Sequence, residues 1–479
     1  MTYSYGNLIG GAWHDTPARF DTFNPARPVQ VAGRYSLADA LLVAEAVAAA
    51  RKAQQPWARL PAAQRCEALA RFIDRIEAHK EDLARAITTE QGKTLAESRG
   101  EAAKACAESR FMLGHVMSSE GTRHVPSLRA GVRNLVMRRP RGVIVAITPW
   151  NFPVMTPMRK IAPALGFGNA VIVKASEFTP AAVCLLGELA SGVLADGLLQ
   201  VIHGGADVGS ALVSHGGVHG VTFTGSVATG RRIVAATAAN LAAVSLELGG
   251  KNAAVIHDAT DLDTCLDQVS NAALMCSGQR CTAVSRVLVR RGLHADVAAG
   301  LARRASAMRL GDGADPATQL GPMTHRAQLE HVKAAVQQAR EDGAMVLAGG
   351  TEVAIAGCEG GLFYAPTVLD GVRADSAAAR EEIFGPVISL IEYDTLDEAM
   401  ALLNDVEYGL TAAFFSNDAA AIARFVDECQ TGMLHVNHGT VPDSHMPFGG
   451  IKASGVGAYS VGPSAAAFFT TEHSVYLGT

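Results

Sequence analysis

A cysteine near the middle of the chain has neighbours that suit a covalent catalyst. Cys281 follows an apolar, helix-like run over 271–276 and stands directly after the bend Ser277-Gly278-Gln279-Arg280. Backbone N–H groups and a guanidinium on such a bend favour thiolate over thiol, and thiolate is the nucleophilic form of cysteine. The alternative is that Cys281 is buried and inert, as most free cysteines are. This stretch alone leaves both interpretations open.

The composition excludes several classes of protein. A chain of 479 residues, with 49% hydrophobic and 18% charged residues, has apolar material for two or three globular domains. A net charge of −5 and no long basic run argue against nucleic acid as a partner. Eight scattered cysteines without a C-x-x-C pair indicate reduced thiols, with no metal site and no disulfide framework. With no signal-like leader or membrane-spanning stretch, we expect a soluble, cytoplasmic protein without a membrane partner.

Strands and helices alternate from Gly142 onward. Apolar strands are expected at 143–148, 170–174, 198–203, 218–224 and 244–248. Such alternation predicts an open parallel sheet, whose ligands sit at the carboxyl ends of the strands. Lys174, the Gly225-Ser226 pair and Glu247 lie at those ends.

The usual dinucleotide fingerprint G-x-G-x-x-G is absent from this sheet. Thr224-Gly225-Ser226 leads into a helix with Gly230 one turn on, which suits a phosphate at a helix N-terminus. Because many strand–helix turns contain Gly-Ser, this signal is weak by itself.

A second α/β region is expected from Lys251 onward. Its strands are predicted at 253–257, 284–289, 361–369, 387–393, 410–415 and 433–437. Its helices are predicted near 262–275, 295–308, 327–342, 396–405 and 419–429.

The two ends of the chain carry less information about chemistry. Short strands are expected over 1–35, then helices over 37–85 that break near Pro56 and Pro61, and a further helix over 94–118. The charged residues of that helix, at 97, 99, 101, 104, 108 and 110, predict a wet face on a scaffold element. The segment 465–477 is aromatic and β-branched, with 475–477 strand-like, and an unpaired terminal strand there would invite pairing with another subunit.

A set of motifs in register resembles the NAD(P)-dependent aldehyde dehydrogenase superfamily over essentially the whole chain. The segments are P-W-N-F-P at 149–153, K-A-S-E at 174–177, F-T-G-S at 223–226 with Gly230, E-L-G-G-K at 247–251, G-Q-R-C at 278–281, E-E-I-F-G-P at 381–386 and P-F-G-G-I-K at 447–452. They are most similar to succinate-semialdehyde, lactaldehyde and phosphonoacetaldehyde dehydrogenase-like members.

The resemblance implies a domain arrangement as well as a fold. The fold is α/β, with a Rossmann-like parallel-sheet NAD-binding domain (1–121 and 141–248) and an α/β catalytic domain (249–464). A β oligomerisation arm would comprise 122–140 and 465–479, in a homodimer or homotetramer.

The resemblance also implies catalytic roles. Cys281 would attack the aldehyde carbon, and the Asn151 amide with the Cys281 backbone N–H would form the oxyanion hole. Glu247 would be the general base that hydrolyses the resulting thioester. Lys160 matches a family position near the catalytic water.

The expected cofactor residues are spread along the first sheet and into the second region. Lys174 and Glu177 would bind the adenine ribose, and Glu382 and Phe384 the nicotinamide ribose. A carboxylate at 177 accepts from a free 2′-OH and repels a 2′-phosphate, so NAD is favoured, while Ser176 keeps NADP possible. Gly225 and Ser226 would contact the pyrophosphate. The remaining expected contacts are Thr148, Pro149, Trp150, Gly205, Gly209, Phe223 and Leu248.

The substrate is harder to infer. Arg159 falls where succinate-semialdehyde dehydrogenases bind the substrate carboxylate, but their second arginine, six positions before the nucleophile (281 − 275), is Met275 here. Arg280 instead precedes Cys281, as in members that act on phosphorylated or phosphonylated aldehydes. Two arginines, with Ser444, His445 and Phe448, predict a short aldehyde with an anionic tail, of the succinate semialdehyde type.

Several alternatives stay open. The aldehyde could be phosphonoacetaldehyde, lactaldehyde or an uncharged or aromatic one, and Arg280 could pair with a structural carboxylate instead. A CoA-acylating dehydrogenase commonly lacks the glutamate base that is present here as Glu247. An inactive protein of this fold would not need Asn151, Glu247 and Cys281 together. A cysteine hydrolase without cofactor would leave Gly225-Ser226 and Glu382 without a role.

Overall fold

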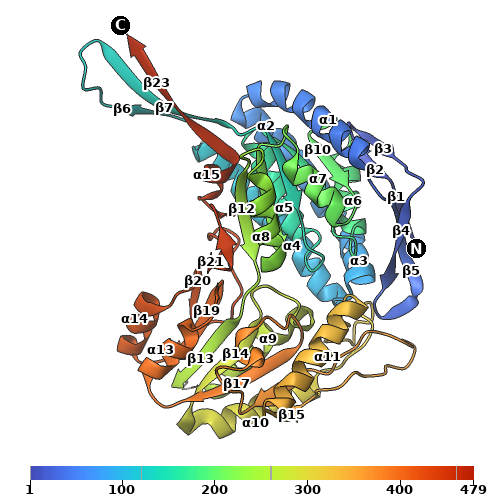
Figure 1. The fold of residues 1–479 in the computed structure, drawn as a ribbon, viewed down its shortest axis with the longest axis vertical. Coiled ribbons are helices and arrows are strands. Elements are labelled where there is room, and N and C mark those ends of the chain that lie inside the picture. Colours follow the sequence, from blue (N-terminus) through green and yellow to red (C-terminus); the bar gives the residue numbers. More distant parts are fainter. Residues whose placement is uncertain (1, 120, 259–260, 460, 479) are drawn as a thin grey trace.

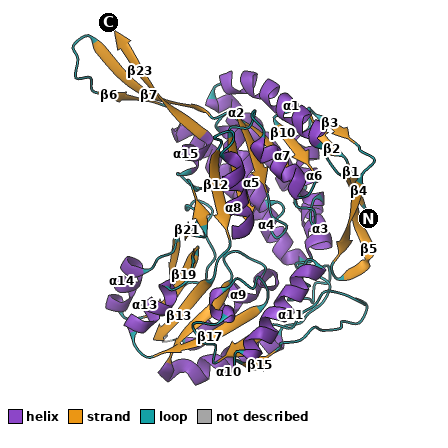
Figure 2. Ribbon diagram, in the orientation of Figure 1, coloured by secondary structure: helices purple, strands orange, loops and turns teal. Residues whose placement is uncertain are grey.

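Two α/β bodies make up most of the protein, and a narrow β arm extends from one of them (Figure 1). The computed structural model describes residues 2–119, 121–258, 261–459 and 461–478. One body is built on an eight-stranded sheet and the other on a seven-stranded sheet. Helices flank the sheet in each body, as the colouring by secondary structure shows (Figure 2).

The eight-stranded sheet has a run of parallel strands at its centre. These strands are β8 (Val143–Ile147), β9 (Ala170–Lys174), β10 (Leu199–Ile202), β11 (Gly220–Gly225) and β12 (Ala243–Leu248). Their spatial order is β12-β11-β8-β9-β10, so the order reverses between β8 and β11. The expected open parallel sheet is confirmed, and a ligand crevice is expected where the order reverses. Asn151 follows β8 and Gly225 ends β11, so both lie at this point.

Helices connect and cover these strands. The connecting helices are α5 (Met155–Gly166), α6 (Ala181–Ala190), α7 (Ala206–Ser214) and α8 (Val227–Thr237). The N-terminal helices are α1 (Ala40–Arg59), α2 (Ala62–Ala78), α3 (Lys80–Gln91) and α4 (Leu95–Ser119). Helix α4 packs along α5, α2 and α3. Short antiparallel strands β2 (Asn7–Ile9), β3 (Ala12–His14) and β22 (Gly455–Val456) extend the sheet at its edges.

The seven-stranded sheet carries the second body. Its strands, in spatial order, are β15 (Met345–Ala348), β16 (Thr367–Asp370), β17 (Val387–Tyr393), β14 (Val284–Arg290), β13 (Asn252–Asp258), β19 (Thr411–Ser416) and β20 (Met433–Val436). All neighbours are parallel except β15 and β16. Its main helices are α9 (Leu262–Leu274), α10 (His294–Ala307), α11 (Arg326–Glu341), α13 (Leu396–Asn404) and α14 (Ala419–Glu428).

The arm is an antiparallel three-stranded sheet of β6 (Thr122–Val125), β7 (Val132–Pro140) and β23 (Thr470–Gly478). The segment before β23 forms α15 (Ala465–Phe469), and Phe468 and Phe469 are buried in the core of the first body. Tyr476 on β23 is 72% exposed. Pairing of the arm with another subunit, and the domain boundaries expected from the sequence, stay predictions.

Two smaller sheets and three short helical elements are also present, one of which is a 3₁₀ turn over Met275–Gly278. One sheet joins β1 (Tyr3–Tyr5), β5 (Arg27–Ser36) and β4 (Arg19–Asn24), and the other joins β18 (Tyr408–Gly409) to β21 (Ile451–Lys452). A 3₁₀ turn spans Arg291–Leu293, and α12 spans Ala377–Arg380.

Two expected features are wrong. The helix is expected to break near Pro56, but Pro56 lies inside α1. The Lys52 carbonyl loses its N–H partner there, and Lys52 is on an exposed face where water can replace that partner. The predicted strand over 361–369 is formed only from Thr367 onward. The residues before it make a single bridge, from Tyr364 to Glu352, and Pro366 has no N–H to donate to a ladder.

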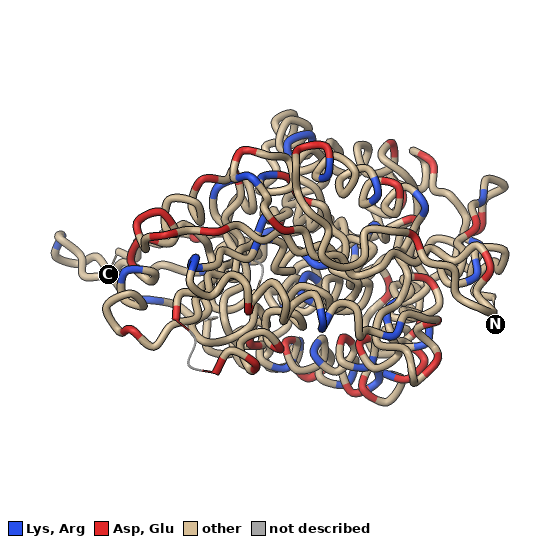
Figure 3. The backbone as a smooth tube through the Cα atoms, turned by 90° about the horizontal axis from the view of Figure 1, so that it is seen from below, with Lys and Arg blue, Asp and Glu red and all other residues tan. Residues whose placement is uncertain are grey.

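Charges of both signs are interspersed along the backbone when the molecule is seen from below (Figure 3). Among the helices that the structure describes, none combines the length and the apolar character needed to cross a bilayer.

Asn169 offers a test of how the first sheet holds the base of the arm. Its buried side chain accepts from the Gly142 N–H (2.8 Å) and donates to the carbonyls of Ala164 (2.9 Å) and Phe469 (3.0 Å). Asn169→Ala leaves these buried groups without partners and is expected to lower the free energy of unfolding by about 3 kcal/mol or more. Thermal unfolding measures the loss.

Asn240 supplies the matched control, because it also makes hydrogen bonds through both side-chain atoms but is only partly buried. Asn240→Ala should lower the unfolding temperature less, since water can reach its partners. Equal shifts for the two variants would contradict the role given to Asn169.

Candidate active site

The three candidate catalytic residues line one cavity. Asn151 lies in the loop after β8, Glu247 lies near the end of β12, and Cys281 precedes β14. The cavity has a volume of about 790 Å³, and its walls come from both bodies. Residues more than a hundred positions apart are therefore brought together at the carboxyl ends of the first sheet.

The turn before Cys281 has an unusual backbone. Helix α9 ends at Leu274, and Cys276, Ser277 and Gly278 then take positive φ angles of 55°, 56° and 68°. A Cβ at Gly278 would lie 2.0 Å from the Gly385 carbonyl oxygen, so only glycine fits there. This turn reverses the chain and directs Cys281 into the cavity.

The Asn151 side chain bridges the two bodies. Its Nδ2 donates to the backbone carbonyl of Gln279 (2.9 Å), and the residue is only 5% exposed. A side-chain amide has two N–H groups, so one remains for an oxygen bound at Cys281.

Glu247 is buried against the neighbouring strand. Its Oε2 accepts from the Thr224 hydroxyl (3.2 Å) on β11. Lys160 lies behind this strand pair and donates to the Thr222 hydroxyl (2.9 Å). Burial lowers the pKa of Lys160 to about 8, and nearby Glu247 opposes that shift. Lys160 does not line the cavity, so any influence on the chemistry passes through Glu247.

Cys281 is half-buried and faces the cavity. Burial raises the pKa of its thiol to about 11; Arg159 and Arg280 act to lower that pKa, whereas Glu247 acts to raise it. The loss of hydration thus opposes the expectation that the surroundings favour the thiolate, and the two guanidinium charges support it.

Half of the expected cofactor residues line the same cavity. They are Pro149, Trp150, Gly225, Ser226, Leu248, Glu382 and Phe384. Glu382 accepts from the Gly250 N–H (3.1 Å), and burial raises the pKa of its carboxyl to about 7. A Cβ at Gly249 would lie 2.1 Å from Glu382 Oε2, so glycine is needed for this approach. Ser226 caps the N-terminus of α8.

The expected adenine-ribose residues lie further away. Glu177 and Gly205 line a second cavity of about 1050 Å³, and the Lys174 ammonium lies 3.5 Å from the Glu177 carboxylate. Five expected contacts line neither cavity, namely Thr148, Lys174, Ser176, Gly209 and Phe223. Their contact with a cofactor stays a prediction.

Arg159 is already paired. Its guanidinium binds the Glu108 carboxylate through two contacts (2.6 and 2.8 Å) and lies over the Phe448 ring at 4.3 Å. Both charged side chains are buried. Arg159 lines the cavity, but Glu108 compensates its charge, which weakens the case for a substrate anion there; the expected contact stays a prediction.

Arg280 is different. Its guanidinium donates to the Thr282 hydroxyl (3.0 Å) and the Thr440 carbonyl (3.4 Å), and it lies 3.3 Å from the Met275 sulfur. Within the described residues, no carboxylate approaches it within 4.0 Å. None of the carboxylates that the structure describes is therefore paired with Arg280, and its contact with a substrate stays a prediction.

Lys104 is a cavity residue that the sequence analysis did not single out. Its ammonium donates to the Pro442 carbonyl and lies 3.9 Å from the Glu108 carboxylate. Burial lowers the pKa of Lys104; Glu108 opposes this shift, while Arg159 and Arg280 add to it.

The predicted wet face of α4 is in part the wall of the cavity. Glu97, Glu101 and Lys104 face the cavity, whereas Arg99 and Arg110 face outward and pair with Glu81 and Asp74 on the surface. The spacing of the charged residues could have indicated this second face, because positions 97, 101, 104 and 108 follow one another at helical intervals of four, three and four and so lie on one side of α4.

Ser444 and His445 do not line the cavity. Val441, Pro442 and Phe448 do so instead, and His445 is exposed with its ring 6.1 Å from that of Phe111. Of the residues expected at the substrate from this segment, only Phe448 faces the cavity.

Comparison with known proteins gives one consistent result. Residues 13–475 match the model of the Aldehyde dehydrogenase family. The chain is 34% identical to α-ketoglutaric semialdehyde dehydrogenase of Bacillus subtilis, over 99% of this chain and 98% of that one. It is 36% identical to betaine aldehyde dehydrogenase of Mesorhizobium japonicum, over 91% of this chain and 89% of that one.

Solved structures agree with this match. The structure of 3,6-anhydro-L-galactose dehydrogenase in complex with NAP superposes with a TM-score of 0.95 at 32% identity, covering 99% and 100% of the two chains. Betaine aldehyde dehydrogenase of Staphylococcus aureus in complex with NAD⁺ gives 0.96 at 30% identity, covering 100% of this chain and 95% of that one.

The raised pKa of Cys281 predicts slow alkylation at neutral pH. Iodoacetamide reacts with the thiolate, so its rate with Cys281 should rise about tenfold per pH unit from about pH 7 to about pH 10. Arg280→Met should slow the reaction at each pH, because the lost charge acts to lower the pKa of the thiol. Mass spectrometry of the Cys281 peptide measures the rate, and Cys281→Ser defines the background. A plateau below about pH 8 would show a resting thiolate instead.

Proposed function

Because the chain belongs to the aldehyde dehydrogenase family, we propose that it oxidises a short aldehyde with an anionic tail to the carboxylic acid. Membership of the family makes the protein an oxidoreductase that acts on aldehydes. What remains to be proposed is the set of residues that do the chemistry, the preferred cofactor and the aldehyde.

Cys281 is the nucleophile of this proposal. Its sulfur bonds to the aldehyde carbon, and the carbonyl oxygen gains negative charge as the thiohemiacetal forms. The free N–H of the Asn151 amide and the backbone N–H of Cys281 bind that oxygen. The charge of Arg280 acts to lower the pKa of the thiol and so assists the attack.

Glu247 is the base for the second half of the reaction. It removes a proton from the water that attacks the thioester, which releases the acid and restores Cys281. The Thr224 hydroxyl donates to one oxygen of this carboxylate and so helps to orient it in the cavity. Lys160 donates to the Thr222 hydroxyl on the same strand and so keeps a positive charge near this carboxylate.

The far end of the cavity fits a nicotinamide dinucleotide. Ser226 caps α8, whose first backbone N–H groups suit a pyrophosphate, and the Gly249 position leaves the Glu382 carboxylate room beside the cavity. When bound, the oxidised cofactor supplies the hydride acceptor. Glu382 would accept from the nicotinamide ribose and Glu177 from the adenine ribose. A carboxylate at 177 opposes a 2′-phosphate, so NAD is the proposed cofactor.

Two cations next to the nucleophile carry the substrate proposal. Arg280 and Lys104 line the cavity of Cys281, whereas the Glu108 carboxylate is taken by Arg159. Four carboxylates, those of Glu97, Glu101, Glu247 and Glu382, also line the cavity, so the positive charge that suits a carboxylate or phosphonate tail is local to Arg280 and Lys104. The similarity to α-ketoglutaric semialdehyde dehydrogenase supports such a tail, and the similarity to betaine aldehyde dehydrogenase supports a different aldehyde.

The test measures NADH formation with succinate semialdehyde, phosphonoacetaldehyde, lactaldehyde, propanal, benzaldehyde and betaine aldehyde. An anionic aldehyde should give the highest kcat/KM. Arg280→Met or Lys104→Met should lower that value by about a hundredfold through loss of a charge-assisted contact, while propanal changes by less than about threefold. The product should be the free acid whether or not CoA is added.

Arg99→Met is the matched control, because Arg99 lies on the same helix as Lys104 but faces outward. It should leave kcat/KM unchanged for every aldehyde. If propanal or betaine aldehyde is preferred, and both cavity variants lower all activities alike, the anionic substrate is wrong.

The cofactor preference has its own test. Native enzyme should show a kcat/KM for NAD at least about tenfold above that for NADP, since the Glu177 carboxylate repels a 2′-phosphate. Glu177→Gln removes the charge at similar volume and should narrow the ratio. A native preference for NADP would overturn the choice.

A further inference from the structure

Lys93, in the turn between α3 and α4, is enclosed by groups next to the cavity. Its side chain has 0% exposure, and its ammonium donates to the backbone carbonyl of Asn151 (2.6 Å) and to Glu101 Oε2 (2.9 Å). The ammonium also lies 3.8 Å from the centre of the Phe152 ring. Lys93 does not line the cavity, so it cannot touch a substrate there.

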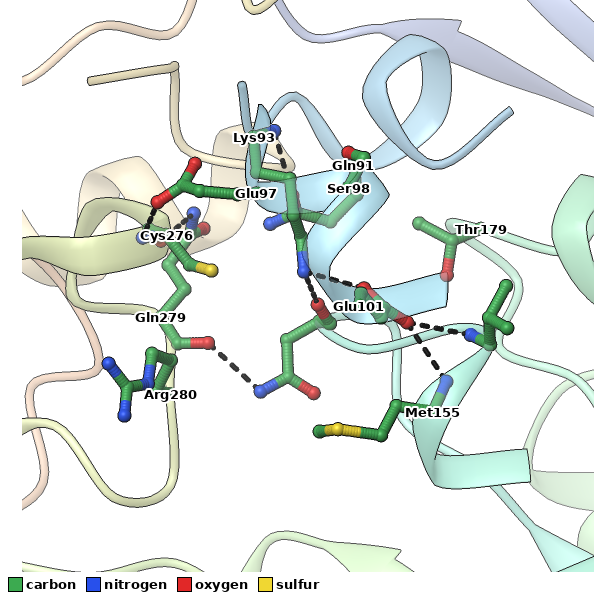
Figure 4. A network of polar contacts seen from close by, with 12 residues as sticks. Gln91, Lys93, Glu97, Ser98, Glu101, Met155, Thr179, Cys276, Gln279 and Arg280 are labelled. Carbon is green, nitrogen blue, oxygen red and sulfur yellow. Dashed lines mark hydrogen bonds and ion pairs between the residues drawn. The ribbon is translucent and has the colours of Figure 1, made fainter. Parts of the chain in front are cut away.

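Glu101 extends this contact to the start of α5. Its Oε1 accepts from the backbone N–H groups of Val154 (2.8 Å) and Met155 (3.1 Å), where a carboxylate also suits the helix N-terminus. Figure 4 shows Glu101 between Lys93 and Met155. The ion pair therefore holds the 151–155 segment at two points, the Asn151 carbonyl and the first amides of the helix.

The loop of Cys281, on the other side of the oxyanion hole, is held by a residue of α4, the helix that carries Glu101. Glu97, one turn before Glu101, accepts from the Cys276 N–H (2.7 Å). The side chain of Gln279 donates to the Cys276 carbonyl (3.1 Å) and accepts from the Thr324 N–H (2.9 Å). The loop of Cys281 is thus held independently of Lys93, as is the carbonyl that the Asn151 side chain reaches.

We propose that Lys93, paired with Glu101, is a positioning residue that sets the backbone of Asn151 so that its amide reaches the oxygen of the aldehyde bound at Cys281. The inference rests on the proposed roles of Asn151 and Cys281. Without the ammonium, the Asn151 carbonyl and one oxygen of Glu101 would be buried acceptors without a donor. The segment would then shift to find new partners, and a displacement of about 1 Å costs about a hundredfold in rate.

A double-mutant cycle tests this with Lys93→Met, Asn151→Ala and the double variant. Asn151→Ala should lower kcat about a hundredfold or more, as loss of one oxyanion donor does. Lys93→Met should lower kcat by about 10- to 100-fold with little change in the KM for NAD. In the Asn151→Ala background, Lys93→Met should change kcat by less than about threefold, because the amide it positions is gone.

An equal loss in both backgrounds would overturn the inference, because Lys93 would then act through general stability. Native kcat in Lys93→Met would overturn it as well. Failure of the proposed function looks different, since Asn151→Ala would then keep native kcat. Alkylation of Cys281 by iodoacetamide, which needs no oxyanion hole, should stay within about twofold of native in Lys93→Met.

Two milder variants keep the test decisive if Lys93→Met does not fold. Lys93→Arg keeps the charge and should recover part of kcat, and Glu101→Gln keeps acceptors for the two amides but removes the charge that holds Lys93. Glu101→Gln should lower kcat less than Asn151→Ala does. Introduced into the Asn151→Ala variant, Glu101→Gln should lower kcat little further. Ser98→Ala is the control, because Ser98 is buried on the same turn of α4 but binds Thr88 instead. A native kcat in Glu101→Gln would count against the proposal. So would a loss of kcat in Ser98→Ala as large as the loss in Glu101→Gln.

Discussion

Hydrogen bonds that cross between the two bodies decide the geometry at Cys281. Each body has its own hydrophobic core, and neither core contains both Asn151 and Cys281. The distance between these residues therefore depends on polar contacts at the boundary, such as Asn151 to the Gln279 carbonyl and Glu97 to the Cys276 N–H. Such contacts are buried, so leaving one unmade is costly, and the boundary has few arrangements of low energy. These directional contacts help to fix how the two bodies are placed at Cys281.

The buried charges near Cys281 are also arranged by specific contacts. The Glu108 carboxylate makes a bidentate contact with Arg159 and lies 3.9 Å from the Lys104 ammonium, so Arg280 and Lys104 are less compensated than Arg159. A buried ion pair contributes little attraction to a third charge, whereas a buried cation without a counter-ion attracts an anion strongly. Arg159, which is paired with Glu108, is therefore assigned a structural role, and Arg280 is the arginine proposed to bind the substrate.

The state of the nucleophile follows from its enclosure. The burial that raises the pKa of Cys281 raises the pKa of the Glu382 carboxyl as well. A resting thiol is protected from oxidation and alkylation, since thiolate is the reactive form. Groups that enter the cavity change that balance, because they replace the missing hydration with fixed dipoles and charges.

The sequence by itself determined the order of strands and helices and the small set of residues with chemical roles. Apolar runs such as 170–174 are buried on both faces, so their composition reports their structure directly. Motifs read in order identified Asn151, Glu247 and Cys281, and the cavity contains all three. Local pattern was misleading where a partner lies far along the chain. Glu108 neutralises Arg159 across 51 positions, and the charged face of α4 meets the cavity instead of water. Only the tertiary structure decided which charges are paired, which are free for a ligand and how strongly the thiol is buried, because each depends on the neighbours that folding supplies.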